Sequence, residues 1–120
     1  MKFSIKEDKG QVVQVAINGC LVQSDIAPPL DPFRAILGPN AYQKVVLLDM
    51  QESNYLDSMC IGWLVASHKR FREQGGKLVI HSLQPVASNV ISLLKLNNIF
   101  QIAADTTTAL QLAQGQGEVV

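Results

Sequence analysis

The sequence is poor in the features that mark several classes of protein. Only 17% of its 120 residues are charged, the ten Lys and Arg balance the ten Asp and Glu, and aromatic residues make up 6%. A chain without net charge has no general field that would attract nucleic acid or an anionic membrane surface. We therefore expect neither a nucleic-acid partner nor charge-driven membrane binding.

Cysteines and long apolar runs are also scarce. The two cysteines, Cys20 and Cys60, lack Cys-x-x-Cys or histidine spacing, which predicts neither a disulfide framework nor a zinc site. The longest apolar stretch, residues 59–66, is far shorter than the roughly 18 residues of a membrane span, and the first residues show no signal-peptide pattern. We expect a soluble cytoplasmic protein without membrane insertion, metal or cofactor.

The apolar residues that are present follow the periods of strands and helices. Residues 3–6 and 11–17 alternate on either side of a turn, as in a β-hairpin, and residues 77–82 and 99–103 predict two further strands. The continuous apolar run at 45–48 is typical of a central strand buried on both faces. Residues 20–30, which contain Pro28-Pro29, predict a loop.

Four helices are predicted between and after these strands. A short one occupies residues 33–37, and the longest runs from Ser58 to a stop at Gly75-Gly76. A third begins at Pro85 and ends at Asn97-Asn98, and the last is capped by Asp105 or Thr106. The third helix is expected to point four aliphatic residues inward, namely Val86, Val90, Leu93 and Leu94.

The alternation of strands and helices predicts the fold class. Parallel strands joined by helical crossovers form an open α/β sheet, so we expect one α/β domain with a mixed sheet of about five strands and helices packed against it. We place this domain at residues 1–114 and a flexible C-terminal tail at residues 115–120.

The junction between the central strand and the longest helix, residues 49–62, is the most informative segment. Sites in such sheets lie beyond the carboxyl ends of the strands, and the unpaired amides of a helix N-terminus favour a phosphate or carboxylate. Ser58 is both a good helix cap and a candidate phosphoacceptor, and capping alone also explains Asp57.

Four segments together resemble the STAS domain, which is named for sulphate transporters and anti-sigma factor antagonists. They are Tyr-Leu-Asp-Ser-Met-Cys-Ile-Gly at 55–62, Gly-Gly-Lys-Leu-Val-Ile at 75–80, and residues 93–100 with 106–110. The resemblance spans most of the chain and implies a STAS-like sheet. It also implies a non-enzymatic bacterial module that binds a kinase-like anti-sigma factor and releases it when phosphorylated.

The chain departs from the family at the start of the longest helix. The family pattern there is Asp-Ser-Ser/Thr-Gly, with the phosphoacceptor on the second hydroxyl residue, and this sequence has Met59 at that position and Cys60 in place of the glycine. A thioether cannot accept a phosphoryl group. Ser58 is a displaced candidate acceptor, but one residue of shift turns a helical side chain by about 100°.

The resemblance also implies which residues contact a protein partner. The implied surface combines the helix start with the loop around Ser24 and Asp25, and comprises Asp57, Ser58, Met59, Gly62, Ser24 and Asp25. Met59 suits an adaptable apolar contact, and filling a gap in the core is an equal alternative.

Two other functions remain open. Stand-alone STAS proteins also serve as cytoplasmic accessory subunits of lipid-transport ATPases, which is the second hypothesis. The third is a small enzyme that uses Cys60 as a nucleophile, although nothing in the sequence places a base beside that thiol.

The remaining titratable residues have structural explanations. His68 falls on the apolar stripe of the longest helix and His81 in a strand, positions typical of structural histidines. Asp49 and Glu52 could serve as acid and base, but a strand-end cap and a solvated loop charge explain them as well.

Overall fold

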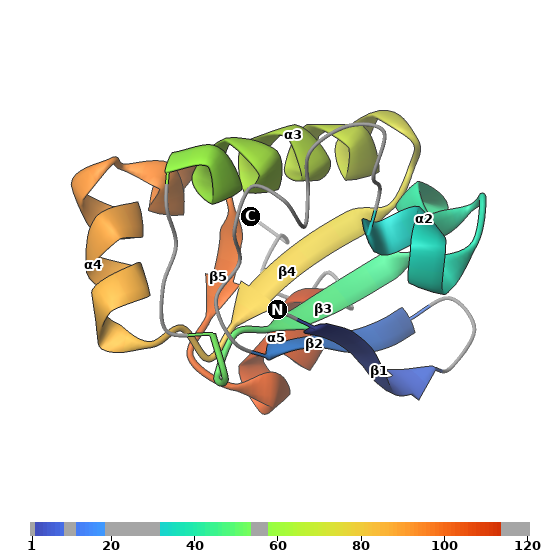
Figure 1. Ribbon diagram of the computed structural model, residues 1–120, viewed down its shortest axis with the longest axis horizontal. Helices are drawn as coiled ribbons and strands as arrows, with labels where there is room; N and C mark the ends of the chain where they lie inside the picture. Colours follow the sequence, from blue (N-terminus) through green and yellow to red (C-terminus); the bar gives the residue numbers. More distant parts are fainter. Residues whose placement is uncertain (1, 9–11, 19–31, 54–57, 114–120) are drawn as a thin grey trace.

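A computed structural model describes residues 2–8, 12–18, 32–53 and 58–113 and forms one open five-stranded sheet (Figure 1). The strands are β1 (Lys2–Asp8), β2 (Val12–Asn18), β3 (Val45–Asp49), β4 (Lys77–His81) and β5 (Gln101–Ala103), and they lie side by side in chain order. β1 and β2 form the predicted antiparallel hairpin, and every other neighbouring pair is parallel. The predicted mixed sheet and its central strand, β3, are confirmed.

Among the described residues, four helices pack against this sheet, as predicted. They are α2 (Pro32–Leu37), α3 (Ser58–Glu73), α4 (Pro85–Leu93) and α5 (Thr106–Ala113), with short 3-10 turns η1 (Ala41–Gln43) and η2 (Leu96–Asn98). Figure 1 shows α3 on one face of the sheet and α5 on the other. Asp105 caps α5, because its Oδ1 accepts a hydrogen bond of 2.8 Å from the Thr108 amide.

The strands divide the apolar core into two clusters, because successive strand residues point to opposite faces. The larger cluster lies between the sheet and α2, α3 and α4, and its strand residues are Val13, Val15, Ile17, Val46, Leu48, Leu78 and Ile80. The smaller cluster lies beneath α5 and contains Leu47, Val79, Ala103 and Ala109. Both faces of β3 are therefore covered, which explains its continuous apolar sequence.

A group of aromatic rings holds α3 against α2 and the hairpin. Phe33 of α2 stacks on Trp63 of α3 with ring centroids 5.4 Å apart, and its edge meets Phe71 of α3 at 5.3 Å. Phe3 of β1 contacts Trp63 edge-on at 5.7 Å. Each such pair contributes about 0.5–1.5 kcal/mol beyond its buried area. The axis of α3 is thereby fixed relative to the sheet.

Two adjacent glycines end α3 for different reasons. Gly75 takes a left-handed φ of +88°, and the Gly76 amide donates a 2.8 Å hydrogen bond to the Phe71 carbonyl, which completes a Schellman motif. Gly76 instead meets a steric limit, because a Cβ there would lie 2.3 Å from the Tyr42 carbonyl oxygen. The predicted glycine stop is confirmed, but only Gly75 is left-handed.

The orientation predicted for α4 is wrong. Leu93 is 81% exposed, Val86 61% and Leu94 55%, and of the four residues expected to point inward only Val90 is half-buried. The buried residues of the helix are Ala87 and Ile91. A nine-residue helix that is apolar on most sides offers competing stripes, and this one buries the stripe that carries its small residue, Ala87.

The end predicted for the same helix is also wrong. α4 stops at Leu93, and Lys95 adopts a left-handed φ of 58° that starts the separate turn η2. Asn98, expected to end α4, belongs to η2. Because left-handed backbone interrupts helical hydrogen bonding, the chain reverses two residues earlier than the pair of asparagines suggests.

The two glycines after α3 should respond differently to alanine. We expect Gly76→Ala to lower the free energy of unfolding by about 3 kcal/mol, because the new methyl group collides with backbone. Gly75→Ala has open space and should cost about 1 kcal/mol from its left-handed φ alone. Urea unfolding of the two variants measures both values, and equal losses would contradict this account of Gly76.

Candidate functional site

The candidate site is the first two turns of α3, at the edge of the sheet where the parallel strands end. The chain leaves β3 at Asp49, turns at residues 51–52, and enters α3 at Ser58. Figure 1 shows that α3 begins at the same end of the molecule at which α4 lies. The predicted junction is therefore at the position where α/β sheets carry their binding sites.

The first turns of α3 have one buried and one open side. Ile61 and Leu64 are buried in the larger core cluster, whereas Gly62 is exposed and a Cβ there would meet no described residue within 4 Å. Ser58 and Met59 are the first two residues of the helix. Residues three and four positions apart share one side of a helix, so the backbone positions of Ser58 and Met59 belong to the Gly62 side.

The structure brings together only part of the predicted contact surface. Ser58, Met59 and Gly62 are in α3, whereas Asp57, Ser24 and Asp25 lie outside the described residues. The joint surface of helix start and loop thus stays a prediction. Cys60, the candidate nucleophile of the enzyme hypothesis, is the third residue of α3.

Asp49 organises the turn that leads to α3. Its Oδ1 accepts a 2.9 Å hydrogen bond from the Gln51 amide, and its Oδ2 forms a 2.9 Å ion pair with the Lys6 Nζ of β1. The turn is also tied to β4, because the Met50 amide donates to the His81 carbonyl at 3.0 Å. Asp49 is a strand-end cap, which is the structural alternative considered from the sequence.

His81 lies beside Asp49 on the neighbouring strand. Its side chain is buried, and its Nδ1 is 2.8 Å from the Ser82 Oγ, where Ser82 has a left-handed φ of 60°. Burial lowers the pKa of His81, an effect that the Asp49 carboxylate opposes and the Lys6 ammonium reinforces. His81 is therefore neutral near pH 7, as expected for a structural histidine.

The pKa of Asp49 is lowered although its burial favours the protonated form. Burial raises this pKa, but the hydrogen bonds from the Gln51 amide and the Lys6 ammonium together outweigh it. A carboxyl with a depressed folded pKa stabilises the fold above its ordinary value of 3.8, and this stabilisation is lost as the pH falls through the folded pKa. The lowered pKa of His81 acts in the same direction below 6.5.

Sequence reasoning missed the apolar surface next to this site. Three aliphatic side chains of α4 and its C-terminus, Val86, Leu93 and Leu94, are exposed. The sequence shows that these three residues are hydrophobic, but the wrong orientation predicted for α4 placed them in the core. Within the described ranges, no group of three or more His, Cys, Asp or Glu residues could hold a metal ion, and no helix there has the length and apolarity to cross a membrane.

Comparison with known proteins relates the whole domain to one family. The STAS domain model matches residues 4–109. A proposed anti-sigma factor antagonist of Thermotoga maritima superposes with a TM-score of 0.74 at 19% identity, covering 93% of this chain and 94% of that one.

Two further solved structures share this fold. An anti-sigma-factor antagonist (STAS) domain protein of Planctomyces limnophilus gives a TM-score of 0.71 at 18% identity, with coverage of 93% of this chain and 97% of its own. An anti-sigma factor antagonist of Mycobacterium paratuberculosis gives 0.70 at 22% identity, with coverage of 94% and 95%. No curated protein matches the sequence.

The charge of Asp49 should be visible in the pH dependence of stability. We expect Asp49→Asn to lower the free energy of unfolding by about 1–2 kcal/mol at pH 7, since Asn retains an acceptor for the Gln51 amide but loses the charge. The difference from the parent protein should shrink as the pH falls below 3.8, because the parent loses the same stabilisation when Asp49 is protonated.

Urea unfolding between pH 3 and pH 7 measures this difference. Glu52→Gln is the matched control, because Glu52 is an exposed carboxylate of the same turn and its replacement should leave the curve within about 0.5 kcal/mol of the parent. A gap between Asp49→Asn and the parent that stays constant with pH would contradict the assigned role.

Proposed function

Because this chain belongs to the STAS domain family, we propose that it is a non-catalytic regulatory module that binds a protein partner through the start of α3. The observation that carries the proposal is the open side of α3 at Gly62, where nothing in the described fold lies within 4 Å of an added Cβ. A partner can approach the helix backbone closely at a residue that has no side chain. The most similar functional class is the anti-sigma factor antagonist, whose name the three similar structures carry.

The apolar side of α4 extends the proposed docking surface. Val86 and Leu93 of α4 are exposed. The helix α4 itself lies at the end of the molecule where α3 begins (Figure 1). A specific protein interface covers about 800 Å² on each partner, with apolar residues at its centre and polar ones at its rim. The start of α3 alone is too small for this, so the exposed aliphatic side chains of α4 would supply further apolar contacts.

A glycine replacement separates binding from folding. We expect Gly62→Gln to stabilise the fold by about 0.5–1 kcal/mol, because glutamine is the better helix former and finds open space. The same side chain should block the partner. A variant that is more stable but no longer binds identifies Gly62 as a contact residue, whereas retained binding would contradict docking at this side of α3.

The measurement requires a defined partner. Tagged protein is expressed in its own cells, captured proteins are identified by mass spectrometry, and the purified pair is measured by calorimetry with parent and variant. Thr107→Gln is the matched control, since Thr107 is exposed on α5 at the opposite face of the sheet and its replacement should leave the Kd unchanged. A serine kinase of the anti-sigma type would support the proposal, and a lipid-transport ATPase would favour the alternative of an accessory subunit.

The second part of the proposal concerns regulation. Met59 stands where the family's phosphoacceptor would be, so we expect the purified partner kinase and ATP to leave the parent protein unmodified, as shown by intact mass. Met59→Ser should gain one phosphoryl group under the same conditions, because it restores a hydroxyl at that helical position. Phosphorylation of the parent at Ser58 would contradict the expected loss of the switch.

Phosphate at this position acts on the partner more than on the fold. It adds about −1.5 to −2 charges, which the helix N-terminus tolerates. The same charge would repel an acidic partner surface and would be costly to desolvate against an apolar one. The phosphorylated Met59→Ser protein should therefore bind the partner more weakly than the unmodified variant, with unchanged stability.

A further inference from the structure

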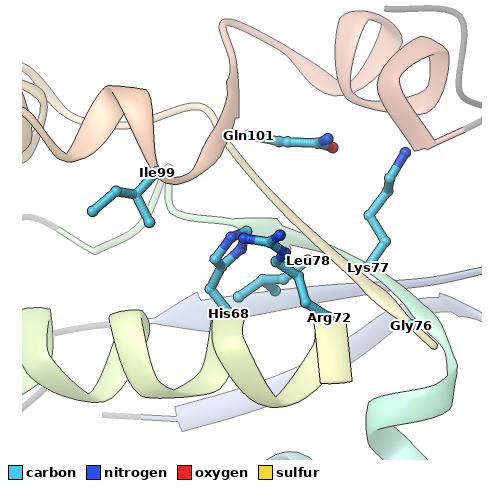
Figure 2. A pocket seen from close by; sticks show the side chains of 7 residues that line it. All are labelled: His68, Arg72, Gly76, Lys77, Leu78, Ile99 and Gln101. Atoms are coloured by element: carbon cyan, nitrogen blue, oxygen red, sulfur yellow. The ribbon is translucent and has the colours of Figure 1, made fainter. Parts of the chain in front are cut away.

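A groove lies between α3 and the segment formed by η2 and β5, well away from the start of α3. It consists of two hollows of about 320 Å³ and 460 Å³, both lined by His68, Arg72 and Ile99. Figure 2 shows the smaller hollow. From Ser58 to Arg72 the helix advances about 21 Å at 1.5 Å per residue. This groove is therefore a separate feature from the proposed docking surface.

The short length of β5 creates the groove. β5 begins at Gln101, which pairs with Val79, so the first two residues of β4, Lys77 and Leu78, extend beyond it. Lys77 and Leu78 contribute to the lining at this point, and Figure 2 shows His68 and Arg72 rising from α3 toward the same space. The volume of each hollow falls within the range of about 300–1,000 Å³ that is typical of small-molecule sites.

One cation of the groove is available to a ligand. Within the part of the chain that the structure describes, Arg72 makes no ion pair or hydrogen bond. Lys77 differs, because its Nζ donates a 2.8 Å hydrogen bond to the Leu112 carbonyl. Lys69 adds a third positive charge at the rim, and Glu73 adds a single negative one. The groove thus favours an anion.

His68 supplies a polar group that the fold leaves incomplete. The residue is only 9% exposed, its ring meets Phe100 edge-on at 5.7 Å, and its Nδ1 is buried with no hydrogen-bond partner among the described residues. Burial and the nearby Arg72 guanidinium lower its pKa, so the ring is neutral and carries one proton. A neutral imidazole carries its proton on either ring nitrogen, so the Nδ1 that lacks a partner can donate its N–H to a carboxylate oxygen.

The rest of the lining is aliphatic. Val65 and Ile99 line the larger hollow and Leu78 the smaller one, and Ile99 is 47% exposed although it is a large apolar residue. Binding sites for small molecules combine such apolar walls with a few convergent polar groups. An arginine fork beside a histidine donor matches a carboxylate, and the aliphatic wall matches a hydrocarbon chain.

We propose that this groove binds a small organic carboxylate with an aliphatic body, whose carboxylate contacts Arg72 and His68 and whose body covers Val65 and Ile99. Lys69, Arg72 and Lys77 outweigh the single carboxylate of Glu73, so the lining attracts an anion. The ligand site is independent of the partner surface at the start of α3.

Octanoate is the probe. Titrated into ¹⁵N-labelled protein, it should shift the amide resonances of His68, Gly76 and Ile99 in a saturable manner. Acetate carries the charge without the chain and octanol carries the chain without the charge, so each should bind about tenfold more weakly or not at all. Octanol that binds as well as octanoate, or octanoate shifts at other residues, would overturn the proposal.

Matched arginine variants test the charge. Arg72→Gln should weaken octanoate binding about tenfold, the value of one charge-assisted hydrogen bond. Arg70→Gln is the control, because Arg70 is an exposed cation of the same helical turn whose guanidinium lies over the Tyr42 ring and outside the groove. Equal effects of the two variants on octanoate binding would also overturn the proposal. The Gly62→Gln variant should bind octanoate as the parent does, whether or not it loses the protein partner.

Discussion

The packing of α3 on the sheet is the constraint on which the other features depend. Phe33, Trp63 and Phe71 interlock with ring centroids 5.3–5.4 Å apart, and the buried residues of α3 join the strands in one cluster. Aromatic packing of this kind tolerates little rotation of the helix about its axis, because interiors are close-packed. Fixing that rotation determines which residues of α3 face outward.

Both candidate binding features follow from that rotation. With Ile61 and Leu64 facing the sheet, Gly62 is left on the open side at the beginning of the helix. Farther along, His68 and Arg72 face the gap beside β4, where β5 is too short to cover the sheet. One helix therefore carries a surface suited to a macromolecule near its N-terminus and a groove suited to a small anion near its C-terminus.

The carboxyl ends of β3 and β4 place two titratable residues in buried positions. Asp49 and His81 occupy neighbouring strands at the carboxyl edge of the sheet, and both are almost fully buried. The carboxylate is tolerated there because the Gln51 amide and the Lys6 ammonium satisfy its oxygens, whereas the histidine stays neutral. These residues hold the turn before α3 in place and explain the acid sensitivity expected of the fold.

Local sequence patterns determined the elements and their order. The alternation in the hairpin, the unbroken apolar run of β3, the cap at Asp105 and the glycine stop after α3 depend on periodicity and backbone preference, which neighbouring residues set. The family resemblance, carried by residues 55–62 and 75–80, likewise required no coordinates and located the candidate site at the start of α3.

Tertiary structure alone decided the features that depend on distant residues. The face of α4 that is buried depends on how closely Ala87 approaches the sheet, so a helix with several apolar stripes left that choice undetermined by its own sequence. The ion pair between Lys6 and Asp49 joins residues from two non-adjacent strands, and the groove at Arg72 exists because another strand, β5, is short. Contacts across the chain arise from the packing of whole elements, which no local pattern encodes.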